Sequence, residues 1–158
     1  MEKTLYDSIE RYIEKYFIHP CRYMRHELNV CKEYENNRIE YAISMAEESF
    51  SERLFNLIKE KEISEVECYK RAGITRQVFS KIRSNKEYKP SRNTAISLAI
   101  SLHLSLTETN KLLETAGFTL SRSNKADLII KYFIINRNWK LSEINEALYS
   151  FGENPLNV

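Results

Sequence analysis

The stretch AGITRQVFSKIRSNKEYKPS, residues 72–91, carries five basic side chains and a single acidic one. Widened to residues 70–92, it holds eight basic residues against Glu87 alone, whereas the whole chain has 24 basic and 22 acidic residues. Solvated helix faces normally mix both signs, as KEKE does at residues 59–62. A stripe of one sign on a nearly neutral protein therefore indicates a surface that meets a polyanion.

Repeated helix-start signals surround this stretch. The segments SFSE (49–52), SEVE (64–67) and SLTE (105–108) fit the capping box, in which Ser and a following Glu satisfy free backbone N–H groups. Thr75 and Ser91 are suited to cap two more helices. The five predicted helices span about residues 50–61, 64–72, 76–84, 92–104 and 107–118. Because glycine and proline number only three each, we expect an all-α fold of helices joined by short connections.

The connection between the second and third predicted helices is three residues long, Gly73-Ile-Thr75. Gly73 supplies the left-handed backbone conformation that commonly ends a helix. So short a turn makes the two helices cross steeply, which is the helix-turn-helix arrangement. In that arrangement the second of the two helices lies in the DNA major groove.

The third predicted helix has two distinct faces. Val78, Phe79 and Ile82 fall on one side, where they can pack against the first two helices. The other side carries Arg76, Gln77, Ser80 and Lys81. Arginine suits the guanine edge, glutamine the adenine edge, and lysine either guanine or a phosphate. We therefore predict that these four side chains contact bases.

A second group of residues is expected to contact the DNA backbone. Basic and hydroxyl side chains follow the third helix, and the helix that starts after Ser91 offers free N–H groups to a phosphate. The predicted phosphate contacts are Thr75, Arg83, Lys86, Tyr88, Lys89, Ser91 and Arg92. Such contacts set register and affinity, whereas base contacts set sequence preference.

Residues 50–118 resemble the Cro/C1-type (XRE) helix-turn-helix domain of bacterial and phage regulators. The resemblance rests on the number of helices, the AGI turn at 72–74, the apolar positions of helix 76–84, and KPS at 89–91 before an Ala/Leu-rich helix. It implies base-edge roles for Arg76, Gln77, Ser80 and Lys81, and phosphate roles for Lys89, Ser91 and Arg92. Many such regulators are two-fold dimers.

Two positions depart from that family's pattern. Glu65 stands where the family often has a phosphate-clamping Gln, and its charge would repel phosphate. Tyr69 stands where the family favours Ala, so the helices must spread or the ring must point outwards. These departures keep a second interpretation open, a non-enzymatic protein-interaction or adaptor module that uses the same fold without specific DNA binding.

Two helical extensions flank residues 50–120. Residues 1–49 carry seven basic and ten acidic side chains, and residues 4–17 form an amphipathic helix. Packing of this extension on the domain core is favoured over a separate arm that binds a partner protein.

Residues 121–158 are predicted to form two helices, which are a possible dimerisation element. Ile129, Phe133, Trp139 and Leu148 are the candidate dimer contacts, and intramolecular core is an equally good use for each.

No enzyme signature is present, since three glycines cannot build a phosphate-cradling loop and no catalytic motif occurs. Neither a metal nor a cofactor is expected; His19, Cys21, His26 and Cys31 lie close in sequence but match no zinc-site spacing. With no signal peptide and no membrane-length apolar run, a cytoplasmic protein is expected. The sequence thus predicts a homodimeric regulator of double-stranded DNA, with residues 1–49 as the candidate site for a protein partner.

Overall fold

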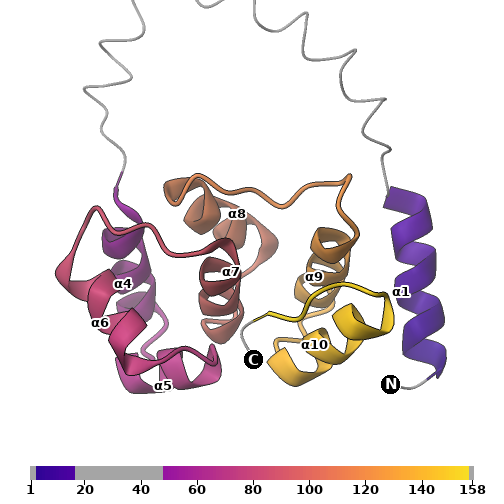
Figure 1. The fold of residues 1–158 in the computed structure, drawn as a ribbon, viewed down its shortest axis with the longest axis horizontal. Coiled ribbons are helices and arrows are strands. Elements are labelled where there is room, and N and C mark those ends of the chain that lie inside the picture. Colours follow the sequence, from indigo (N-terminus) through magenta and orange to yellow (C-terminus); the bar gives the residue numbers. More distant parts are fainter. Residues whose placement is uncertain (1–2, 17–47, 157–158) are drawn as a thin grey trace, which may run out of the picture.

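The computed structural model describes residues 3–16 and 48–156, which fold into helices without strands. This confirms the all-α prediction. The helices are α1 (Lys3–Tyr16), α4 (Phe50–Glu60), α5 (Glu65–Arg71), α6 (Arg76–Ser84), α7 (Arg92–Ser101), α8 (Leu106–Thr115), α9 (Lys125–Ile135) and α10 (Leu141–Ser150) (Figure 1). The bounds of α4 to α8 agree with the five helices expected from the sequence, except that α7 and α8 each end three residues before the predicted end.

Side-chain caps start these helices where the sequence placed them. The hydroxyls of Ser49, Ser64, Thr75, Ser91 and Ser105 each accept a hydrogen bond from the backbone N–H three residues later. Full capping boxes form at Ser49 and Ser105. At Ser64 no reciprocal bond forms, and Glu67 instead pairs with Arg71 one turn further along at 2.5 Å.

Left-handed residues end most of the helices. At the end of α5, Gly73 has φ 64°, and the N–H groups of Gly73 and Ile74 donate to the carbonyls of Lys70 and Tyr69 at 3.1 and 3.0 Å. This pair of bonds is the Schellman motif that the glycine predicted. The same motif ends α4, α7 and α9 with a non-glycine residue at φ 53°, namely Glu62, His103 and Arg137. The early end of α7 follows, because residues 102–104 form this turn.

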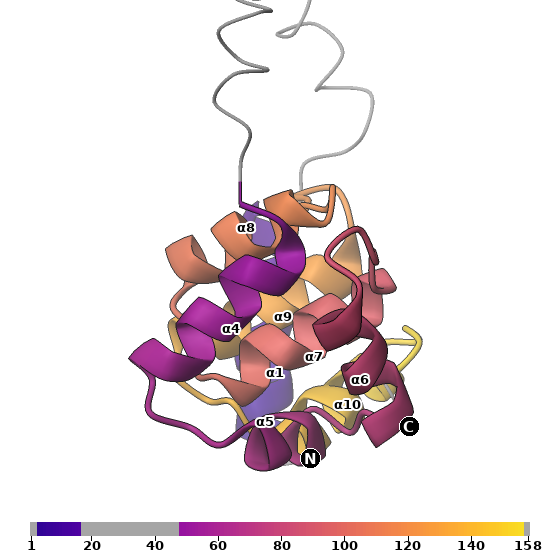
Figure 2. The ribbon, with the colours of Figure 1, turned by 90° about the vertical axis from the view of Figure 1, so that its left-hand side faces the viewer.

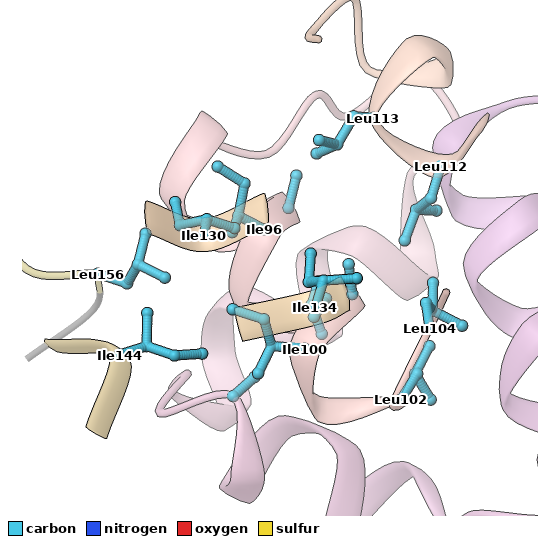
Figure 3. Close-up of a cluster of buried hydrophobic side chains, with 14 of the residues drawn as sticks. Ile96, Ile100, Leu102, Leu104, Leu112, Leu113, Ile130, Ile134, Ile144 and Leu156 are labelled. Carbon is cyan, nitrogen blue, oxygen red and sulfur yellow. The ribbon is translucent and has the colours of Figure 1, made fainter. Parts of the chain in front are cut away.

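Helix α7 lies at the centre of the molecule, between α4 and α9 (Figure 1). Every side chain from Thr94 to Ser101 is buried, including the small residues Ala95, Ser97 and Ala99. Small side chains on a helix covered all round let its neighbours approach closely. Figure 3 shows Ile96 and Ile100 of α7 among buried residues from α8, α9 and α10. Each fully buried Leu or Ile contributes about 1.5–3 kcal/mol of hydrophobic free energy to folding.

The C-terminal helices share this core. Ile129, Phe133 and Leu148 are each at most 1% exposed and pack within the same chain. The intramolecular alternative for these three residues is therefore the one observed, and they offer no surface to a second subunit. Trp139 is half-buried and donates from Nε1 to the carbonyl of Leu104 at 3.2 Å.

Helix α1 packs against α9 and α10, far along the chain. Ile9 is fully buried, the ring of Tyr6 stacks on Phe151 at 4.5 Å, and Tyr12 meets the edge of Tyr132 at 5.4 Å. The expectation that this helix packs intramolecularly is confirmed, although its partner is the C-terminal helix pair rather than α4 to α8. The second helix expected before residue 50 falls almost entirely outside the described residues.

Candidate nucleic-acid interface

Helix α6 presents its polar face to solvent. Phe79 and Ile82 are buried and Val78 is half-buried against the core, as the periodicity predicted. Arg76, Gln77, Ser80 and Lys81 are exposed, and none of them makes an ion pair or a side-chain hydrogen bond with any described residue. Thus four neighbouring side chains with donors, and in two cases acceptors, lie together without partners in the part of the chain that the structure describes.

Three contacts hold α6 in position. The hydroxyl of Thr75 caps its first turn by accepting from the N–H of Val78 at 3.4 Å. At its other end the buried hydroxyl of Ser51 on α4 donates to the carbonyl of Ile82 at 2.8 Å. Between them, Phe79 packs edge-on to Phe55 of α4, with ring centres 5.7 Å apart. The exposed face is consequently carried by a helix that is fixed at both ends.

Tyr69 on α5 also contacts Phe79, with ring centres 5.5 Å apart and the planes tilted by 47°. The tyrosine is half-buried, so its ring covers the edge of the core between α5 and α6. Its neighbour Cys68 points inwards, and its sulfur lies 3.3 Å from the hydroxyl of Ser101. Burial raises the pKa of the Cys68 thiol, which fits a structural role for this cysteine.

Glu65, which like Tyr69 departs from the family's sequence pattern, faces the end of α6. Its Oε2 accepts from Nη1 of Arg83 at 2.9 Å, so the carboxylate neutralises one of the predicted phosphate contacts. The Arg83 side chain remains 64% exposed. An exposed pair of this kind contributes little to stability, and a phosphate can replace the carboxylate.

Lys86, in the loop after α6, pairs in the same way. Its ammonium donates to Oε1 of Glu52 on α4 at 2.7 Å. Glu52 is also the carboxylate of the Ser49 capping box, accepting from the Ser49 N–H at 3.1 Å. The hydrogen bond from Lys86 lowers the pKa of Glu52 most, the hydrogen bond from the Ser49 N–H lowers it further, and the pKa is about 2. A negative charge therefore lies beside Lys86 at neutral pH.

Arg92 at the start of α7 has a structural partner. Its guanidinium pairs with Oδ1 of Asp127, a carboxylate only 2% exposed, and also reaches the carbonyl of Thr119 at 3.4 Å. The other Asp127 oxygen accepts from the N–H of Ser121 at 2.7 Å. Arg92 thus joins the starts of α7 and α9, which sequence reasoning, in assigning it to a phosphate, did not foresee.

Of the remaining predicted phosphate contacts, Ser91 and Tyr88 make structural contacts within the chain, whereas Lys89 does not pair with a described carboxylate. The hydroxyl of Ser91 caps α7 by accepting from the N–H of Thr94 at 3.2 Å. Tyr88 is half-buried and packs against the core, next to the buried Pro90. Lys89 is exposed and, unlike Lys86 in the same loop, makes no ion pair with a described residue. It is the clearest candidate for contact with a polyanion outside α6.

The basic cluster of residues 70–92 is therefore half neutralised within the described residues. Four of its eight cations are paired with carboxylates, namely Arg71, Arg83, Lys86 and Arg92. The four without such a partner are Lys70, Arg76, Lys81 and Lys89. Two of these four lie on the exposed face of α6, so the uncompensated positive charge is concentrated there.

Metal sites and membrane-spanning helices are absent from the part of the chain that the structure describes. Among residues 3–16 and 48–156, no group of three His, Cys, Asp or Glu side chains could hold a metal ion. The cluster of His19, Cys21, His26 and Cys31 lies outside the described residues. Within the same described ranges, no helix has both the length and the hydropathy that crossing a bilayer requires.

Neither a protein-family model, nor a curated protein, nor a solved structure matches this chain. The described residues form an all-helical protein with a buried central helix, α7, and an exposed polar face on α6. Any more specific function therefore depends on the geometry of α5, α6 and the loop that follows.

Proposed function

We propose that residues 50–118 form a helix-turn-helix domain of Cro/C1 type, and that the protein is a sequence-specific regulator of double-stranded DNA. It would be of bacterial or phage type. Helix α6 enters the major groove, where Arg76, Gln77, Ser80 and Lys81 contact base edges. Lys89 and the free N–H groups at the capped starts of α6 and α7 contact phosphates.

One observation carries this proposal. The four side chains that face solvent from α6 have no partner among the described residues, whereas neighbouring basic residues are paired. Hydrogen-bonding groups held on a fixed helix without partners are suited to read a ligand surface. The order of five helices and the left-handed Gly73 between α5 and α6 support the same conclusion.

The experiment is selection from random duplex DNA at about 150 mM salt, where charges more than roughly 8 Å apart are screened. A two-fold site with half-sites about 10 base pairs apart would support a dimer that places one α6 in each half-site. The double variant Arg76→Ala/Lys81→Ala should then lose most of its sequence preference, at about 1–3 kcal/mol for each lost bidentate contact.

A matched control for charge is Lys111→Ala on α8, which removes an exposed lysine outside the basic cluster. This variant should keep the preference for the selected site. If the Arg76→Ala/Lys81→Ala variant also kept that preference, α6 would not be the element that reads the sequence.

The alternative is an adaptor module that binds protein rather than specific DNA. The ion pairs of Glu65 with Arg83 and of Glu52 with Lys86 favour it, because they lower the charge available to phosphates. Binding that is weak and equal for all sequences at the same salt, together with a stable complex with a purified protein, would support the adaptor.

A further inference from the structure

A groove lies between the turn that follows α7 and the turn that follows α9. It consists of two adjoining hollows of about 330 and 380 Å³, which share the side chains of His103, Arg137 and Trp139. Leu106, Ile134 and Ile135 line the first of them. Nothing in the proposed DNA contacts uses this groove.

The groove has a rigid aromatic and aliphatic surface. The imidazole of His103 stacks on the indole of Trp139, with ring centres 4.9 Å apart and planes 16° from parallel. The bond from Trp139 Nε1 to the Leu104 carbonyl fixes the indole. Ile135 is 52% exposed, so its apolar side chain is available for contact. Tryptophan and arginine are the residues that most often dominate binding energy at protein interfaces.

The charge of the groove is positive. Its carboxylate, Glu108, is neutralised by Lys61 at 2.9 Å and also accepts a hydrogen bond from the Ser105 N–H at 2.8 Å. Lys140 is neutralised by Glu143 at 2.8 Å. Burial lowers the pKa of His103, which leaves the imidazole uncharged at neutral pH. Among the lining residues, Arg137 alone carries a charge without an ion-pair partner in the described chain.

Left-handed turns border the groove. His103 and Arg137 both occupy left-handed positions at φ 53°, as does Glu62 at the end of α4, outside the groove, whereas the ends of α5, α8 and α10 use glycine. Because glycine adopts this conformation without strain, the side chain of Arg137 can be removed by substitution with glycine while the turn is kept.

The groove and the exposed face of α6 lie apart. The first turn of α4 contacts the end of α6 through Ser51, whereas Lys61 at the other end of α4 contacts Glu108 of the groove. Ser51 and Lys61 are ten residues apart, which corresponds to about 15 Å along the axis of α4. Figure 2 shows the start of α8 and α6 on opposite sides of the molecule. A ligand in the groove would leave α6 accessible.

We propose that this groove docks a segment of a partner protein that presents large apolar side chains next to a carboxylate. The apolar side chains pack against Trp139, Ile135 and Leu106, and the carboxylate pairs with the guanidinium of Arg137. This assignment holds whether or not α6 binds DNA.

Trp139, the chain's single tryptophan, reports on the groove through its fluorescence. The full chain is titrated at about 150 mM salt with the peptide acetyl-Glu-Leu-Leu-Glu-Glu-Leu-amide, and separately with the same peptide carrying Lys for Glu. We expect a saturable change in emission with the acidic peptide and a much weaker response to the basic one.

The variant Arg137→Gly removes the cation and suits the left-handed backbone, so it should remain folded. It should weaken binding of the acidic peptide about tenfold, as expected for a lost charge-assisted hydrogen bond. The matched control is Glu62→Gly, which makes the same backbone change at the end of α4, outside the groove. Its affinity for the acidic peptide should equal that of the unaltered chain.

Three results would overturn the proposal. The first is no saturable response to the acidic peptide below about 1 mM. The second is equal binding of both peptides, or binding that Arg137→Gly leaves unchanged. The third is self-association of the chain in sedimentation experiments that Arg137→Gly abolishes, because the groove would then join two copies of this protein.

Discussion

Arg83 at the end of α6 donates to Glu65 at the start of α5 across 2.9 Å, so a carboxylate pairs with a cation that the sequence assigned to a phosphate. The pair is largely exposed and exchangeable. Its effect on stability is accordingly small, and its effect on affinity for a polyanion is the more informative quantity.

Replacing Glu65 with Gln should therefore raise the affinity for duplex DNA. The variant frees Arg83 for a phosphate, and each added phosphate contact steepens the log–log dependence of the binding constant on salt by about 0.9. Binding isotherms at several salt concentrations measure this slope. Glu60→Gln removes an exposed charge from the end of α4 and serves as the control. Equal effects of the two variants would mean that only net charge changed.

Replacing Arg92 with Ala should destabilise the fold, because it leaves the carboxylate of Asp127 buried without its cation. Breaking such a pair costs about 3 kcal/mol, near the lower end of the usual range, because Arg92 is itself 32% exposed. Urea unfolding measures the loss. The double variant Arg92→Ala/Asp127→Asn should recover part of it. An unchanged midpoint for Arg92→Ala would assign this arginine to an external ligand alone.

The sequence predicted those parts of the fold that local patterns determine. Ser49, Ser91 and Ser105 cap the helices that their motifs indicated, and Gly73 adopts the left-handed conformation expected of it. The inward face of α6 was equally predictable, because helical periodicity separates Phe79 and Ile82 from the polar side. These features depend on residues within about one helical turn of each other.

The charge compensation of the candidate site was not predictable in this way. The partners of Arg83, Lys86 and Arg92 lie 18, 34 and 35 residues away in the chain, so no local window contains them. Asp127 gave the one available signal, a carboxylate in the first turn of α9, directly before the apolar run of residues 128–135. The turn at His103 was missed for a related reason, since no glycine marks its left-handed backbone.

Stability should fall in acid through Glu108. The hydrogen bond from Lys61 first, and that from the Ser105 N–H second, lower the pKa of Glu108 from 4.5 to about 2. Between these values the unfolded chain binds more protons than the folded one, so the carboxylate's contribution is complete above 4.5 and is lost as the pH falls towards 2.

Glu108→Gln should accordingly reduce the difference between urea midpoints measured at pH 7 and at about pH 3. Glu114→Gln, at an exposed carboxylate of the same helix without an ion pair in the described chain, is the control and should leave the difference as it is. A Glu108→Gln variant that keeps the full acid sensitivity would assign that sensitivity to other carboxylates.

Lys89 provides the prediction that separates general from sequence-specific contacts. It is exposed, has no ion-pair partner among the described residues, and lies in the loop between α6 and α7. If it contacts a phosphate, Lys89→Ala should weaken binding to the selected DNA site and to unrelated duplexes by the same factor, and should lower the salt slope by about 0.9. Gln77→Ala, on the exposed face of α6, should instead weaken the selected site by about 1–3 kcal/mol and leave unrelated duplexes unaffected. Competition assays with both duplexes measure the two effects side by side. If Lys89→Ala changed the sequence preference, or if Gln77→Ala weakened all duplexes alike, the assignment of base contacts to α6 and phosphate contacts to the loop would be wrong.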